Sequence, residues 1–144
     1  MREIKFRGLD ERGIWHYGYF YKAKYYVSQP ILYSFITTPR PKEKNEPSTI
    51  KLVKPETVGQ YTGLKDKNGV DIYEGDLIKI NNEEIPIEFD GYEILFERGT
   101  FLYVYSTCDD TFGQDGFLYH LINDDDVIEV IGNIHNKGND KNES

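Results

Sequence analysis

Apolar residues in this chain come in short runs, and no stretch repeats them at the spacing of an amphipathic helix. The runs are separated by Gly, Asn, Asp and Pro, a pattern typical of strands joined by turns. The composition agrees, because 12 Tyr and 8 Phe stand against a single alanine, Ala23. Aromatic side chains fit the pleated surface of a sheet. We therefore expect a mostly β protein of 144 residues, built as one domain or two small subdomains.

The first part of the chain predicts a sheet with one aromatic face. In the strand Ile14–Tyr21 every second residue from Trp15 onward is aromatic: Trp15, Tyr17, Tyr19 and Tyr21. Gly18, in the middle of this strand, indicates a bulge or a close approach of another backbone. A turn is expected at Asp10–Gly13, and Pro55–Gly59 predicts either a helical turn or an irregular connection. Further strands are expected at Ile4–Arg7, Tyr25–Ser28, Ile31–Thr37 and Ile50–Val53.

The second part predicts strands at the spacing of a small barrel or sandwich. They are Leu77–Ile80, Ile85–Phe89, Tyr92–Phe96, Phe101–Tyr105, Phe117–Leu121 and Val127–Ile134. Residues 39–48, PRPKEKNEPS, contain no apolar residue except proline and are expected to form an exposed loop. We expect an N-terminal β subdomain at residues 1–54, a barrel-like subdomain at 55–136 and a disordered tail at 137–144.

Gln60–Ile80 is the most patterned segment of the chain. Asn68-Gly69 between short apolar runs predicts a β-hairpin with a type I′ turn, in which both residues have positive φ. The oxygens of Asp66, Asn68, Asp71 and Glu74 suggest a calcium loop as an alternative, but glycine and glutamate do not stand at the required positions. Gly75-Asp76 is expected to lead tightly into the next strand. The predicted core residues are Tyr61, Leu64, Ile72, Leu77 and Ile80.

The formal charge of −8 is divided unevenly along the chain. Residues 1–70 hold 13 Lys+Arg against 7 Asp+Glu, a charge of +6, and residues 71–144 hold 4 against 18, a charge of −14. Such a division is typical of a basic binding surface, or of complementary ends that pair between subunits. The simpler alternative is that the two halves neutralise each other within one monomer.

No pattern in the sequence favours catalysis or a cofactor. Cys108 lies beside two acids, which raise a thiol pKa, and as the single cysteine it forms no internal disulfide. His16, His120 and His135 are far apart in sequence and are expected to be structural. Acidic residues at Asp109, Asp110, Asp115 and Asp124–Asp126 are expected to be solvated turns rather than metal ligands. Neither phosphate-binding glycine motif occurs, so no cofactor is expected.

Nucleic-acid binding has some support, because cations and aromatics alternate in REIKFR, YKAKYY and PRPKEK. Lysine and arginine attract phosphates, and exposed tyrosines stack on unpaired bases. The opposing interpretation is that the tyrosines fill a core and the lysines solvate its rim. The candidate contacts are Arg2, Lys5, Arg7, Lys22, Lys24, Arg40, Lys42 and Lys44.

Three blocks of the sequence resemble the YopX family of phage and prophage proteins. They are REIKFRG at 2–8 with GIWHYGYF at 13–20, the central PETVGQYTGLKDKNGVDIYEGDLIKI at 55–80, and IEVIGNIHN at 128–136. The resemblance implies a small, partly SH3-like antiparallel barrel and a phage or prophage gene context. It implies no enzymatic activity and carries no functional residues across.

Together these observations predict a non-enzymatic phage or prophage accessory protein that binds another protein or assembles with copies of itself. Nucleic-acid binding through the basic, aromatic half is the alternative. With no signal peptide or membrane-spanning stretch in the sequence, we expect the cytoplasm of the bacterial host as its location and no membrane partner.

Overall fold

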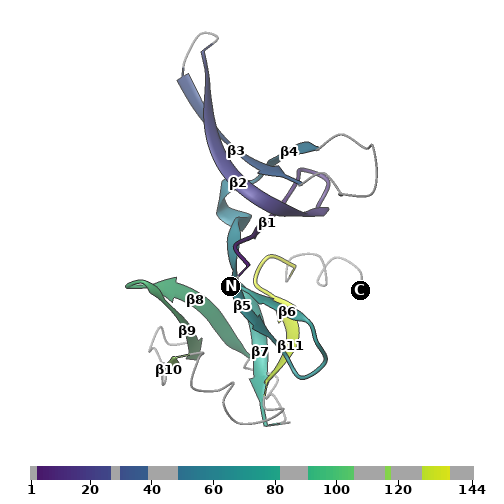
Figure 1. The fold of residues 1–144 in the computed structure, drawn as a ribbon, viewed down its shortest axis with the longest axis vertical. Helices are drawn as coiled ribbons and strands as arrows, with labels where there is room; N and C mark the ends of the chain where they lie inside the picture. The colour runs from purple at the N-terminus through teal and green to yellow at the C-terminus, as the bar shows by residue number, and fades with distance from the viewer. Residues whose placement is uncertain are drawn as a thin grey trace. The chain divides into compact units, whose positions relative to one another are not determined.

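The computed structural model describes residues 3–26, 30–38, 49–81, 91–105, 116–117 and 128–136. The chain forms two compact units, residues 1–61 and residues 62–144. Its strands make two antiparallel sheets, so the all-β prediction is confirmed, and the described strands of neither sheet close into a barrel (Figure 1). The predicted loop at 39–48, the strand at 85–89 and the tail at 137–144 lie outside the described residues.

The first unit contains four strands and one short helix before β5 begins. They are β1 (Phe6–Leu9), β2 (Trp15–Tyr26), β3 (Pro30–Thr37), β4 (Ile50–Val53) and the 3-10 helix η1 (Pro55–Thr57). Neighbours in its sheet follow the order β4-β3-β2-β1-β5. The helical turn predicted near Pro55 is confirmed. The prediction of a separate strand at Tyr25–Ser28 is wrong, because β2 pairs with β3 without a break from Tyr19 to Tyr26.

Glycines let other chain segments approach closely in this unit. At Gly18 strand β2 passes from pairing with β1 to pairing with β3, and a Cβ there would lie 2.2 Å from the backbone oxygen of Thr37. The close approach predicted at Gly18 is therefore confirmed. A Cβ at Gly8 would lie 2.8 Å from Val53 Cγ2, so the Val53 side chain packs directly on the β1 backbone.

Strand β4 and η1 are fastened to the end of β1. The Lys54 N–H donates to the Leu9 carbonyl at 2.8 Å, and the Leu9 N–H donates to Thr57 Oγ1 at 2.9 Å. Leu9, Ile36 and Val53 of this unit are also buried.

In the residues that the structure describes, the second unit contains the later residues of β5 and six further strands. These are β5 (Gly59–Lys65), β6 (Asp71–Tyr73), β7 (Asp76–Ile80), β8 (Tyr92–Glu97), β9 (Thr100–Tyr105), β10 (Gly116–Phe117) and β11 (Ile128–Asn133). One sheet has the order β10-β9-β8-β7-β11, and β6 pairs with β5 (Figure 1). Most of the strand predicted at Phe117–Leu121 lies outside the described residues.

The core of the second unit is built largely from isoleucine. Its buried members are Ile72, Ile78, Ile80, Ile94, Phe101 and Ile128, with Leu64, Tyr92, Tyr103 and Val130 packed against them. The core residues predicted from the sequence are confirmed, because Tyr61, Ile72, Leu77 and Ile80 are buried and Leu64 contacts this cluster.

The hairpin predicted at Asn68-Gly69 is present, but its turn is not type I′. The Gly69 N–H donates to the Asp66 carbonyl at 3.0 Å, and Gly69 alone of the pair has positive φ, at 80°. The loop is a type I turn followed by a left-handed glycine, the usual three-residue hairpin connection. The type I′ turn lies instead at Arg98-Gly99, between β8 and β9, where φ is 53° and 77°.

The Asp10–Gly13 turn of the first unit has the same construction. The Gly13 N–H donates to the Asp10 carbonyl at 3.1 Å, and Gly13 has φ of 78°. In each loop one oxygen of the leading aspartate accepts two backbone N–H groups. Asp10 Oδ1 accepts from Arg12 and Ile14, and Asp66 Oδ1 accepts from Asn68 and Val70.

Gly75-Asp76 leads into β7 as the sequence predicts. Gly75 has φ of 91°, its N–H donates to the Ile94 carbonyl, and its carbonyl accepts the Ile134 N–H. The buried Asp76 carboxylate accepts the Tyr73 N–H at 2.7 Å. The turn therefore joins β7 to β8 and to the residues that follow β11.

Candidate binding surface

Of the eight basic residues predicted as nucleic-acid contacts, the structure describes four, and two of these, Lys5 and Arg7, contact neighbouring side chains. Arg7 is 6% exposed, and its guanidinium carbon lies 4.4 Å from the centre of the Trp15 ring. Lys5 pairs with Glu3 at 3.6 Å and lies over the Tyr61 ring. Both side chains are therefore engaged within the first unit.

Lys22 and Lys24 are the two predicted contacts that lie exposed together. They stand two residues apart on β2 and so share one side of the strand. The other four predicted contacts, Arg2, Arg40, Lys42 and Lys44, lie outside the described residues.

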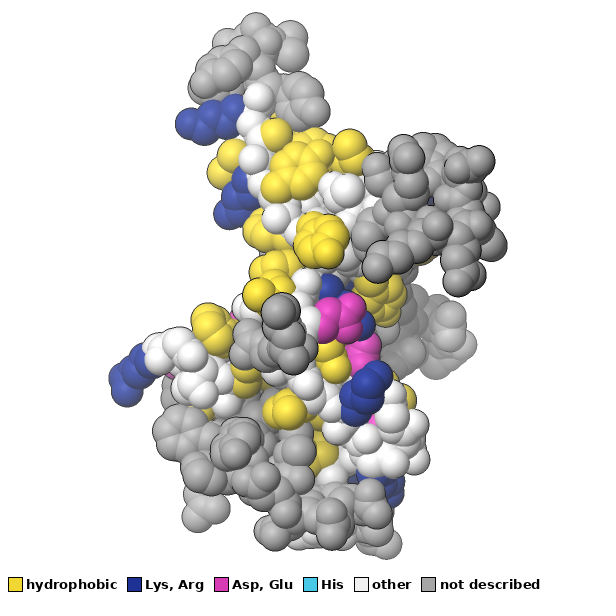
Figure 2. Space-filling view, viewed as in Figure 1, with side chains coloured by type: hydrophobic (Ala, Val, Ile, Leu, Met, Phe, Trp, Pro, Cys, Tyr) yellow, Lys and Arg dark blue, Asp and Glu magenta, His cyan; other side chains and the backbone are white. Residues whose placement is uncertain are grey.

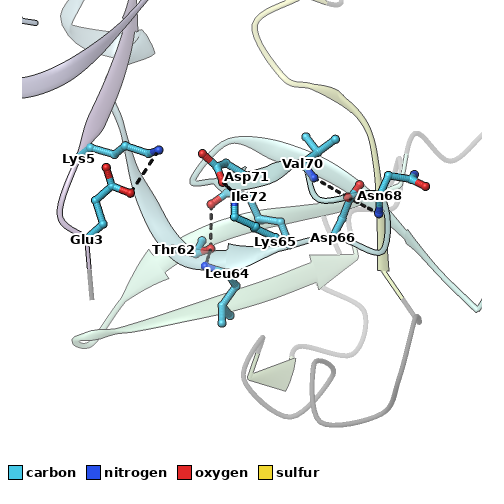
Figure 3. A network of polar contacts seen from close by, with 10 residues as sticks. All are labelled: Glu3, Lys5, Thr62, Leu64, Lys65, Asp66, Asn68, Val70, Asp71 and Ile72. Carbon is cyan, nitrogen blue, oxygen red and sulfur yellow. Dashed lines mark hydrogen bonds and ion pairs between the residues drawn. The ribbon is translucent and has the colours of Figure 1, made fainter. Parts of the chain in front are cut away.

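Two of the four side chains that suggest a calcium loop, Asp66 and Asp71, bind other groups of the β5–β6 hairpin (Figure 3). The Asp66 carboxylate accepts three backbone N–H groups, the third from Val130 on β11 at 3.0 Å. Asp71 pairs with Lys65 at 2.7 Å. Within the part of the chain that the structure describes, no three His, Cys, Asp or Glu side chains gather as metal ligands. Cys108, His120 and the acidic residues near them lie outside it.

Of the remaining histidines, His16 belongs to the Asp10 turn. Its Nε2 lies 2.9 Å from Asp10 Oδ2, and the Arg12 guanidinium lies 3.8 Å from the same oxygen. The hydrogen bond from His16, followed by those from the backbone, lowers the Asp10 pKa from 3.8 to about 2. This pair stabilises a turn. His135 donates its backbone N–H to Asn133 Oδ1 in the turn after β11.

A different set of side chains forms the most exposed apolar surface of the first unit. The β2–β3–β4 register places the odd-numbered residues of β2 and β3 on the same side as Ile50 and Leu52 of β4. We call this side the tyrosine face. Its large members with described side chains are Tyr19, Tyr21, Tyr33, Phe35, Ile50 and Leu52. Tyr19 is 58% exposed, Tyr21 38%, Ile50 58% and Leu52 44%, and Tyr33 and Phe35 are partly buried. Figure 2 shows hydrophobic side chains at the surface over this part of the fold.

The opposite side of the same strands is buried at Ile36 and Val53 and exposed at Lys22, Lys24 and Leu32. The side chains of Lys22, Lys24 and Lys51 lie on the same side of the sheet as the buried side chains of Ile36 and Val53. The strand residues of the tyrosine face include no charged side chain, and residues 13–39 contain no Asp or Glu at all. The charged residues of these strands thus lie on the side that also carries Ile36 and Val53, and the other side is uncharged.

The sequence identified the aromatic rows but not which side of the sheet would be buried. Alternation has the same period whether a face is core or surface. The two glycines offered a signal, because Gly8 and Gly18 are where other segments pack closely against the opposite side.

The charge division found in the sequence follows the two units. Residues 1–61 hold 11 Lys+Arg and 6 Asp+Glu, a charge of +5, and residues 62–144 hold 6 and 19, a charge of −13. In the second unit, Glu129 of β11 pairs with Lys67 at 3.4 Å and Lys79 at 3.1 Å. The hydrogen bond from Lys79 is the main cause that lowers the Glu129 pKa.

Comparison with known proteins places the chain in a family. The model of the YopX protein family matches residues 5–139. No curated protein matches the sequence. No helix within the described residues is long and apolar enough to cross a membrane. Because the match covers nearly the whole chain, the protein belongs to the YopX family.

Proposed function

We propose that this protein is a non-enzymatic phage or prophage accessory protein that binds another protein, or assembles with copies of itself, through the tyrosine face. One observation carries the proposal: the exposed side of the β2–β3–β4 sheet presents six large apolar residues and no charge. The partner has a matching uncharged patch, with acceptors for the tyrosine hydroxyls.

The composition of the tyrosine face supports this choice of ligand. The centres of protein interfaces are depleted in charge and enriched in Tyr and Phe. Exposed apolar patches of several hundred Å² on one face commonly mark interaction sites. A polyanion would instead require cations, and this face has none in its strands. Family membership supports the phage-type context, and we place the protein in the bacterial cytoplasm.

The test compares two matched variants in the cell type that carries the gene. Tyr19→Lys places a charge in the centre of the tyrosine face. Leu32→Lys places the same charge on the neighbouring strand, at a residue that is 50% exposed on the opposite side. Tagged wild type and both variants are purified, and the co-purified proteins are quantified by mass spectrometry.

We expect a partner that wild type and Leu32→Lys retain and Tyr19→Lys loses, with the purified partner binding Tyr19→Lys at least about tenfold more weakly, a difference of about 1.4 kcal/mol. The same proteins captured equally by all three forms would contradict the proposal. Circular dichroism confirms that both variants are folded.

Nucleic-acid binding is the second candidate, favoured by the exposed pair Lys22 and Lys24 on strands that contain no acid. It predicts that single-stranded DNA or RNA is retarded at about 50 mM salt and released as salt rises. Lys22→Glu combined with Lys24→Glu would abolish this binding, whereas Tyr19→Lys would not. No retardation of wild type at that salt concentration excludes this candidate.

A further inference from the structure

We infer that the protein which covers the tyrosine face is a second copy of this chain, related by a two-fold axis. The inference rests on the proposed function, since it names the partner of the same surface. The argument begins with charge. A two-fold axis places a patch of one copy against the same patch of the second copy. Any net charge on the patch therefore faces a charge of the same sign.

The tyrosine face satisfies this requirement and the opposite side does not. Its strand residues carry no charge, so two copies can meet there without repulsion. Packing the other side on itself would oppose Lys22 and Lys24 to the same lysines. Tyrosine and phenylalanine rings also pack well on one another, as Tyr21 and Phe35 already do at 5.2 Å between ring centres.

The segment that joins β3 to β4 has a composition that does not suit it to cover the tyrosine face. Residues 39–48 contain no apolar side chain except three prolines, and they hold Arg40, Lys42, Glu43, Lys44 and Glu46. Covering the tyrosine face with this segment would bury charges without offering apolar contact. A second tyrosine face offers apolar contact without charge.

The exposed area fits a weak dimer. Four of the six side chains are 38–58% exposed and the other two are partly buried, so together they offer on the order of 500 Å² per copy, or about 1,000 Å² in a dimer. This equals the smallest total area expected of a specific interface and falls below the usual value of about 1,600 Å². The dimer should therefore form and dissociate within the concentration range of ordinary solution measurements.

Salt separates this dimer from one held by opposite charges. Pairing between the +5 unit of one copy and the −13 unit of another would weaken as salt is added. An uncharged apolar interface should persist in high sodium chloride and strengthen in sulfate. The direction of the salt effect thus identifies the surface that is used.

The closing experiment measures the mass of the purified full-length protein by sedimentation and light scattering from about 1 µM to about 1 mM, a range that brackets a weak dimer. We expect the mass to rise from 16.8 kDa toward twice that value, with no weakening at high salt. Tyr19→Lys should remain monomeric throughout, and Leu32→Lys should follow wild type.

Two results would overturn the inference. Wild type that stays monomeric at the highest concentration excludes a second copy, and a dimer that Tyr19→Lys leaves intact uses another surface. Neither result decides the proposed function, which is judged by whether a different protein depends on Tyr19 for binding. If, in addition, no different protein depends on Tyr19 for binding, both the inference and the proposed function are contradicted.

Discussion

The two sheets of this protein are made from similar residues and present them in opposite ways. In the sheet of β7, β8, β9 and β11, the side chains that face inward and belong to the core cluster are Ile78, Ile80, Ile94, Phe101 and Ile128. In the β2–β3–β4 sheet, the side richest in aromatic residues faces outward, with Tyr19 and Ile50 the most exposed. The difference shows that alternating aromatic residues in a sequence predict a strand. They do not predict whether the aromatic side of that strand is buried in a core or exposed as a binding surface.

The physical cause lies in the residues that alternate with each row. Gly8 and Gly18 let neighbouring segments approach the strands closely. Ile36 and Val53, on the side opposite the tyrosine face, are buried. The first unit therefore buries apolar side chains other than the tyrosines of β2. The second unit has no such alternative, because its isoleucines are the core.

The largest expected effect comes from truncating the core of the second sheet. Ile94 is fully buried, so Ile94→Ala should lower the free energy of unfolding by about 4 kcal/mol, through lost contacts and the cavity left behind. Urea denaturation measures this loss. A cost below about 1 kcal/mol would mean that this sheet does not bury its apolar side as described.

The Asp10 and Asp66 loops give the next comparison, because they share one construction and differ in the groups that meet the second carboxylate oxygen. Asp66 Oδ2 accepts the backbone N–H of Val130, whereas Asp10 Oδ2 meets the side chain of His16. Asp66→Ala leaves three backbone donors unsatisfied and should cost about 3 kcal/mol in urea denaturation, with faster amide exchange at Val130. Unchanged exchange at Val130 would show that the loop does not anchor β11.

The Asp10 loop should instead respond to acid. Because its folded pKa of about 2 lies below the ordinary 3.8, the Asp10 carboxylate stabilises the fold above about pH 4, and this contribution is lost as pH falls toward 2. Asp10→Asn keeps an oxygen for the turn but cannot titrate. The stability difference between wild type and Asp10→Asn should shrink across that window in urea denaturation at stepped pH. A constant difference would contradict the pairing with His16.

The smallest expected effect is at the tyrosine face itself. Tyr19→Ala removes a large side chain that is more than half exposed, so the unfolding free energy of the monomer should change by no more than about 0.5 kcal/mol. Measured at low concentration, this near-neutral result contrasts with Ile94→Ala. A loss above about 2 kcal/mol would mean that Tyr19 belongs to the core and that the two sheets are alike.

Much of the fold could be predicted from the sequence, because strand and turn signals are local. Alternation identified β2, Gly75-Asp76 marked the start of β7, and the apolar positions of Gln60–Ile80 identified core residues. The loop type at Asn68-Gly69 was predicted wrongly, since the side chain of Asp66 stabilises a longer turn. Local preference for Asn-Gly did not decide the loop.

The candidate site could be predicted only in part, because burial is a property of the whole sheet. The sequence around Arg7 does not indicate that its guanidinium packs on Trp15. Because of this contact and its burial, Arg7 does not belong to an exposed basic surface. Likewise the choice between a tyrosine core and a tyrosine surface depends on Val53 and Thr37, which are distant from β2 in sequence.

The most direct test of the tyrosine face asks what touches it. A photo-crosslinking amino acid, p-benzoylphenylalanine, replaces Tyr19 in one form of the full-length protein and Leu32 in another. After irradiation in the cell that carries the gene, we predict a protein adduct at position 19, chiefly at twice the 16.8 kDa mass of the chain, and little at position 32. Equal adducts at both positions, or none at position 19, would contradict the account.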